Sequence, residues 1–210
     1  MSVDQMAWVR RLPFMLTFLL VMLVSNWLAG IFAGTLRPHV LTAWGISHQS
    51  ILGGEVFRLV TGTFLSHDLG MFVRQFCFAA AVIGTYEWLE GTWRAVAVFF
   101  TVDIVGSVLV LFAVLPLLVG LPYAVGEAEL LTYDVGMSAG GFGLVGAILA
   151  KQDRRWVLLA LATFGIMGKM WVEFEAIADT AHMLCLFLGF GLQTLLKTWR
   201  VGRRSTRPTR

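Results

Sequence analysis

Two polar residues inside apolar segments of this chain have side chains that could carry chemistry together. Ser138 lies in GMSAGGFGLVG, positions 136–146, and His182 lies in AIADTAHMLCLFLGFGL, positions 176–192. A serine hydroxyl is a weak nucleophile until a neighbouring base takes its proton, and an imidazole is the commonest such base. Each residue also has a simpler interpretation. A membrane serine often bonds its own helix backbone, and a membrane histidine can be a packing residue or a cofactor ligand.

The string GMSAG also matches the G-x-S-x-G turn on which α/β-hydrolases carry their nucleophile. That turn requires a strand, a sharp bend and a helix within a sheet. Nothing in the sequence predicts the sheet, and only 72 residues follow Ser138. We therefore exclude the α/β-hydrolase fold. The next question is which elements position Ser138 and His182.

Composition places these elements in a membrane. Of the 210 residues, 58% are hydrophobic and 14% are charged, and the mean hydropathy is +0.78. A soluble domain has about 45–50% apolar and about 25% charged residues. The first apolar run follows Arg10 and Arg11 like a signal peptide, but it is too long for one and lacks a small-residue cleavage site, so we expect a retained span. Cys77 and Cys185 lie in apolar runs and do not form a disulfide pattern.

Hydropathy predicts an all-α protein of six transmembrane helices, because a helix that crosses about 30 Å of hydrocarbon needs about 20 mainly apolar residues. The expected spans are 13–35, 69–89, 94–118, 136–150, 155–172 and 177–197. The fourth is short and rich in glycine, which favours a central, buried helix. The chain then divides into an N-terminal segment at 1–12, a membrane domain at 13–198 and a basic tail at 199–210.

The distribution of basic residues predicts the orientation. With six spans and a cytoplasmic N-terminus, 12 of the 16 Lys and Arg residues lie on the cytoplasmic side, as the positive-inside rule requires. Both termini are then cytoplasmic, and the protein is a multi-pass protein of the cell (cytoplasmic, or inner) membrane. We expect the tail to bind anionic lipid headgroups rather than nucleic acid.

The same topology brings Ser138 and His182 to one depth. The fourth and sixth spans run in the same direction, and the two residues precede Lys151 and Lys197 by 13 and 15 positions. At 1.5 Å per residue both lie about 20 Å from the cytoplasmic ends. Glycines at 136, 140, 141, 143 and 146, together with Gly189 and Gly191, predict that the two helices approach closely.

Three motifs resemble those of the rhomboid family of intramembrane serine proteases. Residues 136–146 resemble G-x-S-x-x-x-F-G-x-x-G, and residues 181–189 resemble A-H-x-x-G-x-x-x-G, with Cys185 at the first of its glycines. The string FRLVT at 57–61 resembles the family's W-R-L-x-T. The resemblance implies a six-helix rhomboid-like bundle and cleavage of transmembrane protein substrates by a dyad of Ser138 and His182, with no metal or cofactor. By resemblance, a bacterial membrane is expected.

The second span departs from the family pattern. Rhomboids carry F-L-H-x-D-x-x-H-x-x-x-N, whose second His and Asn help to bind the oxyanion, whereas here Met71 and Gln75 stand at those positions. Gln75 precedes Glu90 by 15 positions, which places it about 22 Å from the inner end, level with Ser138 and His182. Its amide can donate a hydrogen bond to an oxyanion, Gly136 is expected to support the same site, and Met71 cannot donate. Arg74 is expected either to pair with Asp103 or to assist the oxyanion.

Two functions from different classes follow from these residues. The first is an intramembrane serine endopeptidase. The second is a catalytically weak or inactive rhomboid-like protein that binds or assembles other membrane helices, which Met71 and Cys185 favour. A transporter, supported only by Arg74, Asp103 and the histidines, is the third interpretation.

Overall fold

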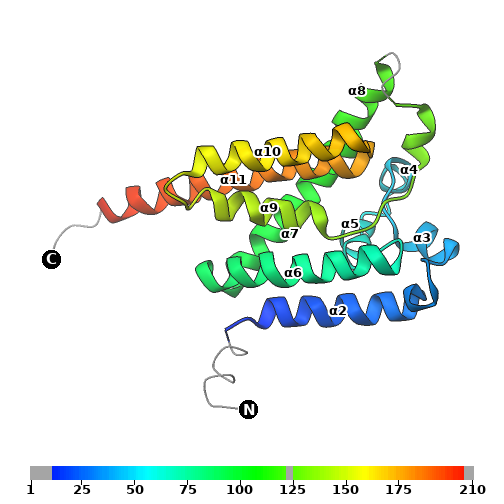
Figure 1. Cartoon of the computed structure of the whole chain (residues 1–210), viewed down its shortest axis with the longest axis horizontal. Helices are drawn as coiled ribbons and strands as arrows, with labels where there is room; N and C mark the ends of the chain where they lie inside the picture. The colour runs from blue at the N-terminus through cyan, green and yellow to red at the C-terminus, as the bar shows by residue number, and fades with distance from the viewer. Residues whose placement is uncertain (1–10, 122–124, 206–210) are drawn as a thin grey trace, which may run out of the picture.

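The chain folds as a bundle of helices, described by a computed structural model for residues 11–121 and 125–205. No strand occurs in these ranges, which hold only isolated bridges. Figure 1 shows the long helices lying side by side. Those of the bundle are α2 (Pro13–Ala29), α6 (Leu69–Glu90), α7 (Thr92–Leu109), α9 (Ser138–Leu149), α10 (Arg155–Val172) and α11 (Ala176–Ser205). The short elements are η1 (Ile31–Ala33), α3 (Pro38–Trp44), α4 (His48–Leu52), α5 (Arg58–Thr61), η2 (Gly62–Phe64), η3 (Val110–Val114), α8 (Leu115–Gly120) and η4 (Glu127–Leu131).

Four helical segments are long and apolar enough to cross a membrane: α6, the continuous run 92–120, α10 and 176–198 of α11. Two further apolar helices, α2 and α9, are shorter, with 17 and 12 residues. The α2 helix ends at Ala29 and not near residue 35 as expected, because Gly30 adopts the left-handed conformation (φ 89°) that ends a helix. The α11 helix continues into the expected tail, to Ser205. The rest of that tail and residues 1–10 lie outside the described ranges.

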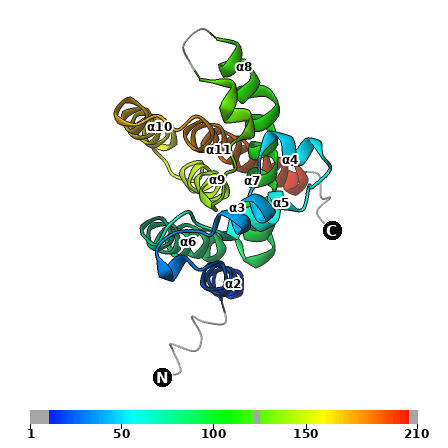
Figure 2. The same ribbon diagram turned by 90° about the vertical axis from the view of Figure 1, so that its right-hand side faces the viewer.

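Successive long helices alternate in direction. In Figure 1, α2 begins and α11 ends on the same side of the bundle, and α6, α9 and α11 run the same way. The view along the bundle in Figure 2 places α9 among α6, α7, α10 and α11, and α9 packs against each of them. The glycine-rich helix is therefore central, as its composition predicts.

Glycines bring α9 and α11 into backbone contact. A Cβ atom added at Gly146 would overlap the carbonyl oxygen of Leu186, and one added at Gly189 would overlap the backbone of Gly143. On the other side of α9, a Cβ at Gly140 would lie 2.8 Å from the ring of Phe99 on α7. Helices in lipid associate through such close packing, since the surrounding hydrocarbon supplies no hydrophobic driving force between them.

The segment 30–68 between α2 and α6 is held by buried polar side chains. Arg58, 6% exposed, donates to the carbonyl oxygens of Thr42 and Gly45 and pairs with Glu55 at 2.9 Å. Asn26 of α2 donates to the carbonyl oxygen of Phe64 at 2.8 Å. These bonds satisfy irregular backbone that hydrocarbon cannot solvate, and they fix the segment against the helices.

A π-helical turn, η3, interrupts the third long helix. It covers Val110–Val114 and is followed by Pro116 in α8. Proline has no N–H to donate, and its ring collides with the carbonyl four residues earlier, so the preceding turn must widen. The widened turn brings Val110 and Leu111 to the wall of a cavity described below.

The glycine contacts generate a stability prediction with a matched control on the same helix. Gly189→Ala should destabilise the protein by about 1–3 kcal/mol or more, because the added methyl group cannot be accommodated against Gly143. Gly191→Ala should be neutral or stabilising by up to about 1 kcal/mol, because nothing lies within 4 Å of its Cβ position and alanine favours helix. Thermal unfolding in detergent measures both. Equal midpoints for the two variants would contradict the described packing.

Candidate active site

Ser138 and His182 lie within hydrogen-bond distance of each other. The Oγ atom of Ser138 is 2.8 Å from Nε2 of His182, and which atom donates depends on the imidazole tautomer. The imidazole stacks on the ring of Phe142, with ring centroids 4.4 Å apart and planes inclined by 30°. The expectation that equal depth and glycine-rich helices bring the two side chains together is confirmed. The arrangement is that of a nucleophile and its base.

Ser138 is the first residue of α9, and the segment before it is held in place by backbone bonds. The N–H of Gly136 donates to the carbonyl of Gly62 at 2.9 Å, and Asp134 exchanges two backbone bonds with Ile46. Gly136 has φ 135°, a conformation that residues with a Cβ rarely adopt. This sharp entry places the hydroxyl of Ser138 at the helix N-terminus, where the first N–H groups have no acceptor within the helix.

Two N–H groups of this turn remain available to a ligand. Among the described residues, no hydrogen bond engages the backbone N–H of Ser138 or of Ala139. The third N–H, of Gly140, donates to Asp103. Free amides beside a nucleophile are the donors that stabilise a developing oxyanion.

Gln75 provides a side-chain donor at the same place. Its side chain is buried, and its Oε1 accepts from the hydroxyl of Ser66 at 3.1 Å. Its Nε2 lies against Gly136, at a point where a Cβ on that glycine would overlap it. No described residue accepts a hydrogen bond from this Nε2. The structure therefore brings Gln75 to the segment that carries Ser138.

Met71 lies beside Gln75, one turn earlier on α6. Its methyl group is 3.1 Å from the position that a Cβ of Gly136 would take. Its sulfur accepts from the backbone N–H of His67 at 3.3 Å. Met71 thus occupies space next to the expected oxyanion site without donating to it.

Arg74 and Asp103 are not brought together. Arg74 is exposed on α6, with its guanidinium close to Gly70, one turn away. Asp103 is 3% exposed and binds Thr63 and Gly140. The expected ion pair is wrong because adjacent helix positions point about 100° apart, and Gln75 is the one of the two neighbours that faces inward. For the same reason Arg74 does not point towards the site of Gln75.

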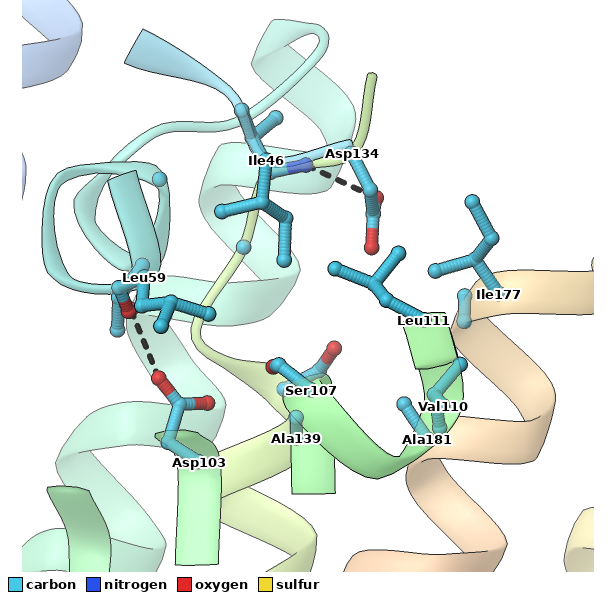
Figure 3. A pocket seen from close by; sticks show the side chains of 16 residues that line it. Ile46, Leu59, Asp103, Ser107, Val110, Leu111, Asp134, Ala139, Ile177 and Ala181 are labelled. Atoms are coloured by element: carbon cyan, nitrogen blue, oxygen red, sulfur yellow. Dashed lines mark hydrogen bonds between the residues drawn. The ribbon is translucent and has the colours of Figure 1, made fainter. Parts of the chain in front are cut away.

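A small cavity of about 20 Å³ opens beside Ser138, room for about one water molecule. In Figure 3, Asp103 and Ser107 of α7 line one side, Ile177 and Ala181 of α11 line the other, and the Ile46–Asp134 backbone pair closes the end. Sequence reasoning missed the parts played by Thr63, Ser66 and Asp134. The one feature of the sequence that could have indicated these three residues is that each is polar and lies close to an apolar segment.

His67 and Asp134 form an ion pair across the loops that lead into α6 and α9. The distance from Nε2 to Oδ1 is 3.7 Å, longer than a direct hydrogen bond. The interaction with the Asp134 carboxylate raises the pKa of His67 above its ordinary value, and partial burial opposes this increase. The contact between His67 and Asp134 therefore joins the two loop segments that lead into α6 and α9.

This pair predicts a pH-dependent contribution to stability. Because the pKa of His67 is higher in the folded state, its contribution is complete below the unfolded-state value of about 6.5 and is lost as the pH rises through the folded-state value. His67→Gln should lower the unfolding midpoint at pH 5.5 and have little effect at pH 8.5. Equal effects at both pH values, measured by unfolding in mixed detergent, would exclude a charged pair.

The dyad geometry predicts crosslinking between the two positions. With Cys77 and Cys185 replaced, cysteines introduced at Ser138 and His182 should be joined in membranes by a short bifunctional thiol reagent. A control pair uses Ser138→Cys with Leu195→Cys, since Leu195 lies on α11 but about 20 Å farther along the helix. Equal yields for the two pairs would contradict the described register of α9 and α11.

Neither side chains nor comparisons identify a cofactor or a family. Among the described residues, no group of three His, Cys, Asp or Glu side chains could hold a metal ion. A scan against protein-family models finds no match, and a search of curated proteins finds none either. The function of this chain is therefore inferred from the geometry of the site and from the resemblance of its motifs.

Proposed function

We propose that this chain is an intramembrane serine endopeptidase that cleaves transmembrane protein substrates. One observation carries the proposal: the distance of 2.8 Å between the Ser138 hydroxyl and the His182 imidazole, inside a bundle with four helices able to cross a membrane. A polar pair inside apolar helices is energetically costly, and such residues are therefore candidates for a functional role. The proposed topology has six spans and cytoplasmic termini in the cell membrane, with the basic tail on anionic lipids.

The proposed reaction has two halves. His182 takes the proton of Ser138 as Oγ attacks the carbonyl carbon of the scissile peptide, and the same proton passes to the departing amine as the C–N bond breaks. A water molecule then attacks the acyl-enzyme, gives its proton to His182 and releases the carboxylate as Ser138 is re-formed. In both halves the negative oxygen is held by Nε2 of Gln75 and by the backbone N–H of Ser138.

A second function rests on Met71. Its methyl group packs at Gly136, where an oxyanion would need a donor and open space. If the methyl group of Met71 fills the oxyanion site, the chain keeps its helix bundle and its lipid-facing surfaces but cannot catalyse peptide hydrolysis. It would be a rhomboid-like protein that binds or assembles other membrane helices.

The oxyanion donors generate the prediction that separates these functions. In the protease, a serine-reactive fluorophosphonate labels wild type, and Ser138→Ala abolishes the label. Gln75→Ala should lower the rate of labelling and of cleavage by about 10²–10³, the usual effect of removing one oxyanion donor. Met71→His should increase both rates, because an imidazole can donate where the thioether cannot.

The measurement is single-turnover cleavage of a transmembrane test substrate, together with probe labelling of the purified full chain. Ser25→Ala serves as a matched control, since Ser25 lies on α2 and lines a groove that includes neither residue of the dyad. Equal, near-zero rates for wild type, Gln75→Ala and Met71→His across a panel of substrates would exclude the protease and favour the helix-binding protein.

A further inference from the structure

Asp103 is a buried carboxylate that the proposed reaction does not use. It lies in α7, within the apolar run 92–120, and is 3% exposed. A carboxylate at this depth is costly, and such residues persist where they are fully bonded and have a role. Here each oxygen has one donor: the Thr63 hydroxyl binds Oδ2 at 2.8 Å, and the Gly140 N–H binds Oδ1 at 2.8 Å.

The bond to Gly140 caps the helix that begins at the nucleophile. The residue before α9 is Met137, which makes no side-chain cap. Helices usually begin after a Ser, Thr, Asp or Asn whose side chain accepts from the second or third N–H. Asp103 supplies that acceptor from another helix, and it does so at the third residue of α9, two positions after Ser138. A negative group at this end also suits the helix dipole.

Asp103 also joins three elements at the level of the dyad. Thr63 belongs to η2, at the end of the external segment, and Gly140 belongs to α9. Phe99 and Val102, on the same face of α7, pack directly against Gly140 and Gly143. Figure 3 shows Asp103 beside Ala139 and Ser107 at the cavity wall. Any movement of the first turn of α9 would therefore break bonds to this side chain.

We propose that Asp103 is a positioning residue of the catalytic site. By accepting from Gly140 it holds the first turn of α9, so that Ser138 Oγ stays within reach of His182 and the N–H of Ser138 stays turned towards the oxyanion. This inference rests on the proposed protease function. It assigns no contact between Asp103 and the substrate.

The two hydrogen bonds of Asp103 indicate which substitutions distinguish its role as a helix cap from the effect of its negative charge. In Asp103→Asn, Oδ1 can still accept from Gly140, and the amide nitrogen can donate to the oxygen of Thr63. The Thr63 hydroxyl then donates to the carbonyl of Leu59, from which it already lies 3.2 Å. Asp103→Leu keeps the branching at Cγ, with methyl groups in place of the two oxygens, and removes both acceptors. The asparagine variant therefore conserves the cap without the charge, and the leucine variant removes it.

The experiment measures the rate of fluorophosphonate labelling of Ser138 in purified full chain, well below the unfolding temperature of each variant. Asp103→Asn should label within about tenfold of wild type. Asp103→Leu should label about 10²-fold more slowly, the effect expected when a reacting group is displaced by about 1 Å. If Asp103→Leu does not fold, Asp103→Glu replaces it, and displacing the carboxylate by one methylene should slow labelling at least about tenfold.

Glu87 provides the matched control for stability. It is a second buried carboxylate that caps a helix from another one, accepting from the N–H groups of Phe14 and Met15 at 2.9 and 2.8 Å. It lies twelve residues beyond Gln75 on α6, about 18 Å from the site. Glu87→Leu should therefore lower the unfolding temperature and leave the labelling rate of the folded protein within about threefold of wild type.

The outcomes separate the inference from the function on which it rests. If wild type is not labelled while a known serine hydrolase is, the protease function and this inference both fail. If wild type is labelled and the folded Asp103→Leu or Asp103→Glu variant reacts at the same rate, the function stands and the inference is wrong. If Glu87→Leu slows labelling as much as Asp103→Leu does, Asp103 contributes only stability, and the inference is again wrong.

Discussion

The contact between the backbones of α9 and α11 is the constraint on which the rest of the structure depends. Gly143 and Gly146 meet Gly189 and Leu186 with no room for a single Cβ atom. Only at this separation can a serine side chain, which is short, reach an imidazole on the neighbouring helix. Because lipid gives helices no hydrophobic reason to associate, the close approach itself supplies the attraction. The geometry of the dyad and the stability of the bundle thus have the same origin.

The end of the bundle that carries the dyad is organised by polar groups that hydrogen-bond to irregular backbone. Arg58 binds two carbonyls of the segment 30–68, Asn26 binds that of Phe64, and Gly136 donates to Gly62. Backbone outside a helix cannot remain unsatisfied at membrane depth. Each of these bonds therefore both solvates the irregular chain and fixes its position relative to Ser138, so a rigid approach to the nucleophile follows from the solvation requirement.

The sequence predicts the helical segments and the levels of the site residues well. Hydropathy locates apolar segments along the chain, and the expected spans 69–89, 94–118, 136–150 and 155–172 agree with observed helical segments to within a few residues. The last expected span, 177–197, matches the apolar part of α11, which continues to Ser205. The level of Gln75 relative to Ser138 follows from the rise per residue. The expected first span, 13–35, is too long because hydropathy does not register the left-handed turn at Gly30.

Rotation about a helix axis, and partners in the backbone, could not be predicted in the same way. Arg74 and Gln75 are at nearly one level, yet one is exposed and the other is buried. The ion pair of Arg74 with Asp103 is expected from charge alone, because both are charged residues inside expected spans. The actual partners of Asp103 are a loop hydroxyl and a main-chain N–H, and a backbone N–H leaves no mark in the sequence. Pairing residues of opposite charge gives the wrong partner when a buried carboxylate accepts hydrogen bonds from neutral donors.

The side chains of Met71 and Gln75 beside Gly136 determine whether the site could stabilise an oxyanion. Met71 accepts from the His67 backbone and brings only a methyl group to Gly136, so it adds bulk and no positive charge. Gln75 has its oxygen bound to Ser66 and its nitrogen directed at Gly136, which orients the donor before any substrate arrives. An oxyanion donor is effective because it needs no reorganisation as charge develops. In the proposed reaction the oriented amide of Gln75 and the backbone N–H of Ser138 share this charge, and the methyl group of Met71 limits the space in which the oxygen forms.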